Sequence, residues 1–325
     1  MNDYLLEVDD LHVEYRTDDA DVYALNGLNL KVEKGEKIGL VGETGAGKTT
    51  LALSILRLLP AKVGKITQGS IKYEGEELLD KPDSYMLGLR GRRISMIFQD
   101  PMTSLNPVIS VGDQILEVLK LHFPDLSEKE KNAKVDEILQ LVGIPASRKG
   151  EYPHQFSGGM KQRIVIAMAL IAEPELLLAD EPTTALDVTI QAQILELMKE
   201  LKEKYNSAVI MITHDLGVVA EFCDKVAVVY GGRVVENGTV EDIFGDGHKH
   251  PYTEGLIHCI PDLTSDAPRL DPIPGRMADP RIRPAGCCFA DRCPHATDVC
   301  RTTPPKMIYE GEHGILCHLY DKEAN

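Results

Sequence analysis

The stretch Lys37–Thr50, KIGLVGETGAGKTT, decides the fold. Its first five residues predict a short buried strand, and the helix formers after the glycines predict a helix that ends near Pro60. Between them, Gly42–Thr49 matches G-x-x-x-x-G-K-[ST] in full, in the strand–loop–helix context that a phosphate loop requires. The glycines let backbone N–H groups face phosphates, Lys48 reaches the β- and γ-phosphates, and the Thr49 hydroxyl ligates Mg²⁺. A plain glycine turn, the alternative, requires neither side chain.

An α/β pattern extends on both sides of this loop. After about Gly245 the chain becomes rich in proline, histidine and cysteine and loses its periodicity, so we place a boundary there. The expected strands are Leu5–Val8, Leu11–Tyr15, Leu28–Val32, Lys37–Val41, Gly69–Glu74, Arg93–Phe98, Leu176–Ala179, Val209–Thr213 and a hairpin of Val226–Tyr230 with Arg233–Glu236. The expected helical segments are Thr50–Leu59, Val111–Leu141, Met160–Ile171 and Ile190–Lys204.

Composition restricts the class of protein. The 325 residues leave room for one large domain and a smaller appendage. A formal net charge of −16 argues against a surface that binds nucleic acid through its phosphates. The acidic N-terminus does not resemble a secretory signal, and no apolar run approaches the length of a membrane span. We therefore expect a cytoplasmic protein whose membrane role, if it has one, comes through partners.

Two adjacent carboxylates, Asp180 and Glu181, follow the apolar strand Leu176–Ala179. Neighbouring residues of a strand point to opposite faces, so the two side chains should have different tasks. We expect Asp180 to hold Mg²⁺, through water, and Glu181 to polarise the attacking water as a general base. Carboxylates at a strand end are commonly only a solvated rim, but the phosphate loop in the same chain favours the catalytic interpretation.

A serine and two glycines, Ser157-Gly158-Gly159, stand at the start of the helical run that includes Met160. They offer a hydroxyl and accessible N–H groups to an anion. An ordinary helix cap is the alternative interpretation. The position just upstream of the acidic strand favours a role in anion binding.

The chain carries, in this order, GETGAGKT, Gln99 in IFQDP, FSGGMKQR, LLLADEP, Ala185-Leu186-Asp187, and His214 in ITHD. These motifs and their order resemble those of the ATP-binding cassette (ABC) family over residues 5–245. The resemblance implies a P-loop NTPase (RecA-like) core with an antiparallel β-subdomain and a helical subdomain at about residues 100–170. The implied domains are an ABC ATPase at 1–245 and a small cysteine-rich C-terminal extension at 246–325.

The resemblance also implies roles that spacing alone does not give. Gln99 would contact Mg²⁺ and the attacking water and report to a transmembrane partner, Asp187 would lie at a dimer seam, and His214 would contact the γ-phosphate. Tyr15 would stack on adenine, with Tyr23 as the alternative. Met160 departs from the glutamine found in many members. The implied catalytic residues are Glu181, His214, Gln99, Lys48 and Asp187, and the implied Mg²⁺ ligands are Thr49, Gln99 and Asp180. The implied ATP-binding residues are Tyr15, Gly42, Thr44, Gly45, Ala46, Gly47, Lys48, Thr49, Thr50, Ser157, Gly158 and Gly159. Of these, Ser157, Gly158 and Gly159 would contact the nucleotide held by the other subunit.

Phe98–Pro107, FQDPMTSLNP, is longer than the general glutamine motif and resembles the ATPase subunits of dipeptide and oligopeptide importers, as does His250–Thr253. That branch also includes nickel and some oligosaccharide systems. It implies a heterodimer with a second related ATPase, two permeases, an extracytoplasmic binding protein, and a place on the cytoplasmic face of the membrane. A soluble ABC ATPase acting on ribosomes or DNA is the competing hypothesis, although a single cassette and the acidic charge weigh against it. The resemblance does not identify the solute.

Five of the seven cysteines lie at Cys287–Cys317, while Cys223 and Cys259 stand alone. Four thiolates suit either zinc or an iron–sulfur cluster, and none of the spacings is the CxxC of a zinc finger. In the importer branch, Cys287, Cys293, Cys300 and Cys317 resemble the ligands of a [4Fe–4S] cluster. Cys288 is an alternative to Cys287, and zinc or unliganded thiols also stay open.

Overall fold

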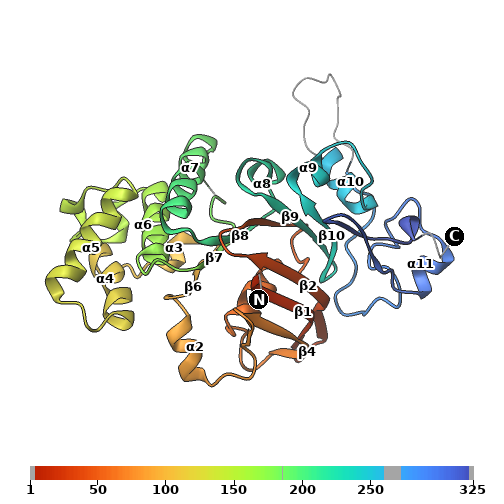
Figure 1. The fold of residues 1–325 in the computed structure, drawn as a ribbon, viewed down its shortest axis with the longest axis horizontal. Helices are drawn as coiled ribbons and strands as arrows, with labels where there is room; N and C mark the ends of the chain where they lie inside the picture. The colour runs from red at the N-terminus through yellow and green to blue at the C-terminus, as the bar shows by residue number, and fades with distance from the viewer. Residues whose placement is uncertain (1–3, 185, 260–271, 322–325) are drawn as a thin grey trace. The chain divides into compact units, whose positions relative to one another are not determined.

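The computed structural model describes residues 4–184, 186–259 and 272–321, and Figure 1 shows their fold. The described chain divides into two units. The first unit comprises the residues up to Glu33, Lys37–Asp80 and the residues from Ile212 onward. The second comprises Lys34–Glu36 and Lys81–Met211. The described residues of the predicted C-terminal extension, 246–259 and 272–321, therefore belong to the first unit.

An antiparallel sheet forms one part of the first unit, with strand order β2-β1-β4-β5. Its strands are β1 (Tyr4–Arg16), β2 (Asp21–Glu33), β4 (Gly64–Tyr73) and β5 (Glu76–Glu77). The two predicted strands Leu5–Val8 and Leu11–Tyr15 are one strand, β1. Its register against β2 shifts between Val8 and Leu11, where Asp10 takes a left-handed backbone with φ 47°. This bulge separates the two apolar runs in the sequence without ending the strand.

A second set of strands in the first unit carries the phosphate loop. β3 (Lys37–Val41) pairs in parallel with β9 (Lys225–Tyr230), and β9 pairs antiparallel with β10 (Arg233–Thr239), as the predicted hairpin requires. β12 (His313–Leu316) and β11 (Met307–Glu310), which the sequence pattern did not predict, extend this set beyond β10. The helices of the unit are α1 (Lys48–Ile55), α8 (Leu216–Phe222), α9 (Val240–Phe244), α10 (Pro251–His258) and α11 (Asp298–Thr302).

The second unit is mainly helical. Its helices and strands are α2 (Asp83–Leu89), β6 (Ile94–Ile97), α3 (Pro101–Ser104), α4 (Val111–His122), α5 (Glu128–Leu141), α6 (Gly158–Leu170), β7 (Leu176–Asp180) and α7 (Val188–Tyr205). β8 (Ala208–Thr213) begins in this unit and ends in the first. Strands β6 and β7 of this unit pair in parallel, and Figure 1 shows helices α4 and α5 beside α6.

Two predicted helices differ from the structure for local reasons. The segment 111–141 contains two helices, because Pro124 follows α4 and Ser127 opens α5 with a capping box that includes Glu130. α1 ends at Ile55, before the predicted stop at Pro60, because Arg57 takes a left-handed backbone with φ 52°. None of the described helices has both the length and the apolar character that crossing a bilayer requires.

Candidate nucleotide-binding site

The phosphate loop follows β3 and leads into α1, as predicted. Gly42, Gly45 and Gly47 all have positive φ, at 151°, 87° and 106°. A Cβ on Gly42 would lie 2.2 Å from the Val229 carbonyl oxygen, and one on Gly47 would lie 2.6 Å from the Ala24 carbonyl oxygen. Only glycine satisfies both the backbone angle and the space at these two positions. The sequence thus builds a tight loop whose backbone can approach a ligand closely.

Lys48 is the first residue of α1, and its side chain is buried against the loop. Its Nζ donates to the Gly42 carbonyl at 2.6 Å and to the Glu43 carbonyl at 3.0 Å. Thr49 beside it is exposed. The loop therefore presents one ammonium group and one hydroxyl at the start of a helix, where the helix dipole also favours an anion.

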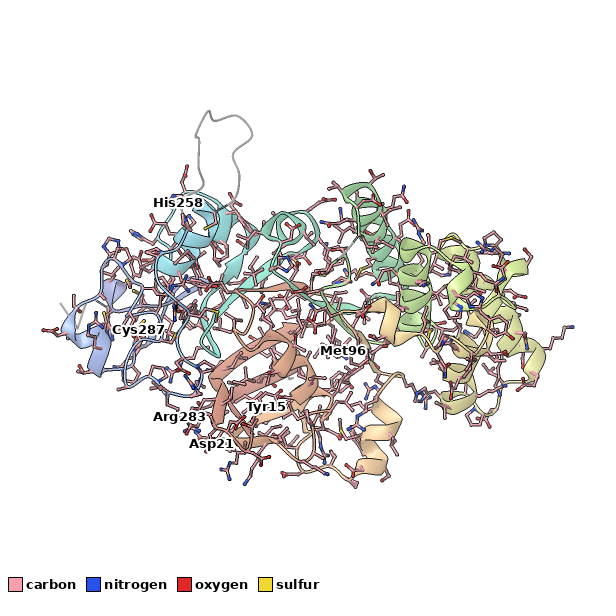
Figure 2. All side chains as sticks on the ribbon, turned by 180° about the vertical axis from the view of Figure 1, so that it is seen from behind. Tyr15, Asp21, Met96, His258, Arg283 and Cys287 are labelled. Atoms are coloured by element: carbon pink, nitrogen blue, oxygen red, sulfur yellow. The ribbon has the colours of Figure 1, made fainter. Side chains whose placement is uncertain are left out.

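Tyr15, on β1, donates or accepts a hydrogen bond with the Thr50 hydroxyl at 3.2 Å, so the structure brings these two predicted residues together. Tyr23, the alternative aromatic residue, has the Arg283 guanidinium 4.4 Å from its ring centroid. Figure 2 labels Tyr15 and Arg283, and Arg283 also pairs with Glu14. One face of the Tyr23 ring is therefore already covered by a cation.

In the second unit, the structure brings Glu181 and Gln99 together. Asp180 ends β7 and is buried, and Glu181 after it has a left-handed backbone with φ 46°. The Glu181 carboxylate accepts hydrogen bonds from the Gln99 amide at 3.0 Å and from the Thr184 hydroxyl at 2.9 Å. A non-glycine residue in this conformation costs about 1–3 kcal/mol, and such strain is concentrated at functional sites. Thr184 was not predicted as a site residue.

The residues Ser157-Gly158-Gly159 open α6. Ser157 is its N-cap and accepts a hydrogen bond from the Met160 backbone N–H at 3.4 Å. A Cβ on Gly158 would meet nothing within 4 Å, whereas one on Gly159 would lie 2.7 Å from Cγ2 of Ile190. Gly158 is therefore accessible to a ligand, and Gly159 allows α7 to approach α6 closely.

The two remaining predicted catalytic residues are exposed. Asp187, in the second unit, is the N-cap of α7 and accepts a hydrogen bond from the Ile190 backbone N–H at 3.0 Å. His214, in the first unit, follows β8, and Asp215 after it caps α8. Ala185, part of the predicted Ala185-Leu186-Asp187 motif, lies outside the described residues.

The four predicted cysteine ligands lie in the first unit, and Figure 2 labels Cys287. The Cys287 backbone N–H donates to the Cys300 carbonyl at 2.7 Å. Burial, and then the charges of Cys287, Cys293 and Cys300, raise the pKa of the Cys317 thiol to about 11. Within the described residues, however, no group of three or more histidine, cysteine, aspartate or glutamate side chains is arranged to hold a metal ion.

Cys288 has a different environment from its neighbour. It is buried, and its thiol donates to the Tyr230 carbonyl at 3.5 Å. A Cβ on Gly231 would lie 3.1 Å from Cβ of Cys288, so the side chain packs closely against the turn between β9 and β10. This arrangement directs Cys288 toward the β9–β10 turn.

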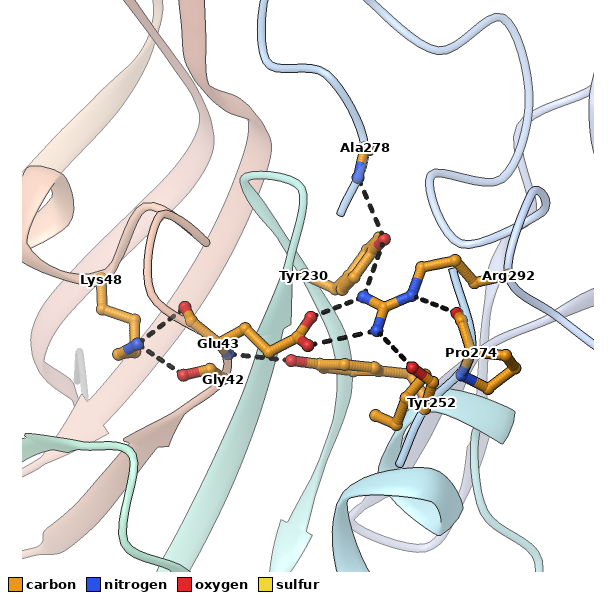
Figure 3. Close-up of polar contacts among 9 residues, drawn as sticks. Gly42, Glu43, Lys48, Tyr230, Tyr252, Pro274, Ala278 and Arg292 are labelled. Atoms are coloured by element: carbon orange, nitrogen blue, oxygen red, sulfur yellow. Dashed lines mark hydrogen bonds and ion pairs between the residues drawn. The ribbon is translucent and has the colours of Figure 1, made fainter. Parts of the chain in front are cut away.

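The contacts between the phosphate loop and the C-terminal residues were not predicted. A cavity of about 260 Å³ is lined by Thr44 and Gly45 of the loop and by C-terminal residues that include Met277, Ala278, Asp279, Pro280, Ile282 and Pro284. The Glu43 backbone N–H donates to the Tyr252 hydroxyl at 2.9 Å, and the Glu43 carboxylate pairs with Arg292 (Figure 3). Since 249 positions separate Glu43 from Arg292, no local signal in the sequence indicates this pair.

Comparison with known families agrees with this geometry. The family model "ABC transporter" matches residues 25–184, and the model "Oligopeptide/dipeptide transporter, C-terminal region" matches residues 235–300. A solved ATP-binding cassette, MJ0796, in a dimer bound to ADP and phosphate, is similar with a TM-score of 0.65 and 27% identity, over 72% of this chain and 98% of that one. The predicted fold class, an α/β P-loop cassette with parallel and antiparallel strands, is confirmed.

Two relatives match nearly the whole chain. The dipeptide transport ATP-binding protein DppD of Bacillus subtilis is 50% identical over 323 residues, which are 98% of this chain and 96% of that protein. The oligopeptide transport ATP-binding protein OppD of Salmonella typhimurium is 50% identical over 303 residues, which are 93% of this chain and 89% of that protein. The chain therefore belongs to the ABC transporter family, in the group of oligopeptide and dipeptide transport ATP-binding proteins.

Proposed function

We propose that this chain is the ATP-hydrolysing subunit of an ABC importer for dipeptides or oligopeptides. The observation that carries the proposal is that a chain resembling peptide-transport ATPases over nearly its full length has both a complete phosphate loop and a Glu181 carboxylate held by two donors. Nickel or oligosaccharide importers of the same branch are the alternative substrates. A soluble ABC ATPase is disfavoured by the match to the transporter C-terminal region.

In this proposal Lys48 and the loop N–H groups bind the phosphates of ATP, Tyr15 stacks on adenine, and His214 contacts the γ-phosphate. Tyr15 is preferred to Tyr23 because Arg283 covers one face of the Tyr23 ring. Gly158 and its neighbours would contact the nucleotide of a second cassette, with Asp187 at the seam.

Mg²⁺ is expected with ATP, and the donors present fit it. Thr49, Gln99 and Asp180 offer the hydroxyl, amide and carboxylate oxygens that a hard cation prefers. When bound by these residues, Mg²⁺ would supply positive charge that balances the charge developing on the phosphates. Glu181 would take the proton of the attacking water, and Gln99 and Thr184 would hold its carboxylate in position for that step.

The similarity to peptide-transport ATPases supports a proposal for the partners and the location. We expect two permeases, a second ATPase that completes a heterodimer, and an extracytoplasmic binding protein that selects the solute. The chain would then lie on the cytoplasmic face of the membrane. Its own contribution is ATP-driven closure and reopening of the dimer.

A [4Fe–4S] cluster on Cys287, Cys293, Cys300 and Cys317 belongs to the same proposal. The hydrogen bond from the Cys287 backbone N–H to the Cys300 carbonyl supports it by holding two of the four residues together, and the hydrogen bond of Cys288 to Tyr230 favours Cys287 as the fourth ligand. The cluster would stabilise a segment with little core of its own. Anaerobically purified protein should contain iron and sulfide in near-equal amounts. Colourless protein that carries zinc would instead identify a zinc site.

The test of function is affinity purification of this chain from its native membranes in mild detergent, with mass spectrometry of the proteins and small solutes that co-purify. Two multi-span permeases, a second ATPase and trapped peptides would support a peptide importer. Trapped nickel or oligosaccharide would change the substrate class. A soluble assembly on ribosomes or DNA, without a membrane protein, would reject the transport function while leaving the ATPase activity intact.

A further inference from the structure

Arg292 is a buried charge whose hydrogen-bonding capacity is fully used. Its side chain is only 4% exposed. Nε donates to the Pro274 carbonyl at 2.9 Å, Nη1 to Glu43 at 2.6 Å and the Tyr230 hydroxyl at 3.4 Å, and Nη2 to Glu43 at 3.2 Å and the Ile273 carbonyl at 3.3 Å. A guanidinium has five N–H donors, so each has an acceptor. Figure 3 shows this arrangement around the Glu43 carboxylate.

Glu43 is the second residue of the phosphate loop, and it is held at three points. Its carboxylate pairs with Arg292 through two hydrogen bonds, the geometry that gives such pairs both strength and a fixed direction. Its backbone N–H donates to the Tyr252 hydroxyl, and its carbonyl accepts from Nζ of Lys48. The residue is therefore fixed through its backbone as well as its side chain, and one of its partners is the phosphate-binding lysine.

The groups that hold Glu43 stand on a rigid aromatic cluster of Tyr230, Tyr252 and Phe289. The ring centroids of Tyr230 and Tyr252 are 4.6 Å apart, and those of Tyr230 and Phe289 are 5.2 Å apart. All three side chains are buried. Arg292 lies 5.7 Å from the Tyr230 ring and 5.9 Å from the Phe289 ring. The cluster therefore leaves Arg292 little freedom to follow a displaced loop.

We propose that Arg292 is a positioning residue for the phosphate loop. Through Glu43 it holds the loop in the conformation that binds the phosphates of ATP, so the C-terminal residues set the nucleotide affinity of the cassette. This inference rests on the proposed function of Gly42–Thr49. The alternative is a salt bridge that only fastens the C-terminal residues to the fold. Both alternatives predict lower stability when one partner is removed, so stability alone does not separate them.

The pair can be removed in a way that separates affinity from stability. Glu43→Gln alone leaves the buried Arg292 guanidinium without its carboxylate, and Arg292→Met alone leaves the partly exposed Glu43 carboxylate without its cation, so both single variants should be less stable. The double variant Glu43→Gln/Arg292→Met leaves no buried unpaired charge and keeps a similar volume, so it should be more stable than Glu43→Gln alone. It does not restore the anchor of the loop. Arg281→Met is the matched control, because Arg281 pairs with Asp279 in the same part of the chain but is 64% exposed.

The experiment measures equilibrium binding of ATP and of ADP to the purified full-length chain, together with KM, kcat and thermal unfolding of each variant. We expect the Kd of both nucleotides and the KM to rise at least about fivefold in both single variants and in the double variant, with a smaller change in kcat. ADP is included because the loop surrounds the β-phosphate that both nucleotides share. Arg292→Lys, which keeps the charge but not the two parallel hydrogen bonds, should fall between wild type and Arg292→Met.

The outcomes are distinct. A double variant that regains stability and binds ATP with the wild-type Kd would overturn the inference and leave only a structural salt bridge. If the single variants do not fold, the double variant still decides the question. Wild-type protein and Arg281→Met that fail to bind ATP, or Lys48→Ala that binds it normally, would instead reject the assigned phosphate loop, and the proposed function with it.

Discussion

The Gln99 side-chain amide donates to the Glu181 carboxylate at 3.0 Å, although 82 positions separate the two residues in the sequence. Gln99 follows β6 and Glu181 follows β7, and these strands pair in parallel with Ile97 opposite Ala179. The carboxyl ends of paired parallel strands meet at one edge of a sheet. The register of β6 against β7 therefore sets the contact between the proposed general base and the glutamine beside it.

Glu181→Gln should leave ATP binding nearly unchanged and reduce hydrolysis by about 10²- to 10⁴-fold. The amide keeps the shape of the side chain and its contacts with Gln99 and Thr184 but does not accept a proton from water. Nucleotide binding and steady-state turnover of the purified chain measure the two effects separately. Turnover near the wild-type rate would remove Glu181 from the role of base.

Thr184→Val should lower kcat by about tenfold and leave the Kd for ATP unchanged. The substitution keeps the volume but removes the hydroxyl that donates to the Glu181 carboxylate at 2.9 Å. Because Gln99 is also a proposed Mg²⁺ contact, Thr184 is the cleaner probe of how the carboxylate is oriented. Thr302→Val is the control, since the Thr302 hydroxyl bonds the Asp298 carbonyl on an exposed helix. Equal kcat values for the two variants would argue that the Thr184 contact does not orient the base.

Sequence reasoning worked best where a signal is local. β3 and β8 are short apolar runs, and Gly42–Thr49 carries its chemistry within eight positions, so the phosphate loop could be located without a structure. The bulge at Asp10 was missed because it leaves the alternation on each side intact. The interruption of the helix predicted at 111–141 depends on the capping of α5 by Ser127. This signal is local, but it was missed because the helical spacing of apolar residues continues on both sides of it.

The missed parts of the site depend on contacts between distant segments. β12 pairs with β10 through Ile315 and Glu236, and nothing in the short run His313–Leu316 identifies its partner. In the sequence, Arg292 is only a neighbour of Cys293 in a cysteine-rich segment. Its function in the fold depends on the distant residue Glu43, with which it pairs. Thr184 likewise acquires a role only once the turn after β7 brings its hydroxyl to Glu181.

Gly159→Ala should destabilise the fold by about 1–3 kcal/mol, whereas Gly158→Ala should not destabilise it. A Cβ at Gly159 would lie 2.7 Å from Cγ2 of Ile190 on α7, and one at Gly158 would meet nothing within 4 Å. Thermal or urea unfolding of the two variants makes a matched comparison, since both glycines lie in the first turn of α6. Gly158→Ala should instead reduce ATP-dependent dimer formation, because its methyl group would occupy the surface offered to the other cassette. A Gly158→Ala protein that dimerises normally would argue against that surface.

Cys223 predicts how stability changes at alkaline pH. Burial, and then the charge of Asp224, raise the pKa of its thiol from 9.0 to about 12. As the pH rises above 9, the unfolded chain loses the thiol proton while the folded chain keeps it, so this group lowers the free energy of unfolding. Between the two pKa values, the free energy of unfolding should fall by up to about 1.4 kcal/mol for each pH unit because of this thiol.

Cys223→Ala should therefore lose stability less steeply than wild type between pH 9 and pH 11. Urea unfolding gives the free energy of unfolding of both proteins at each pH, and the slopes of these values against pH are compared. The other cysteines contribute equally to both slopes, and the cost of the smaller side chain does not change with pH. Parallel slopes would show that the folded thiol ionises as readily as the unfolded one.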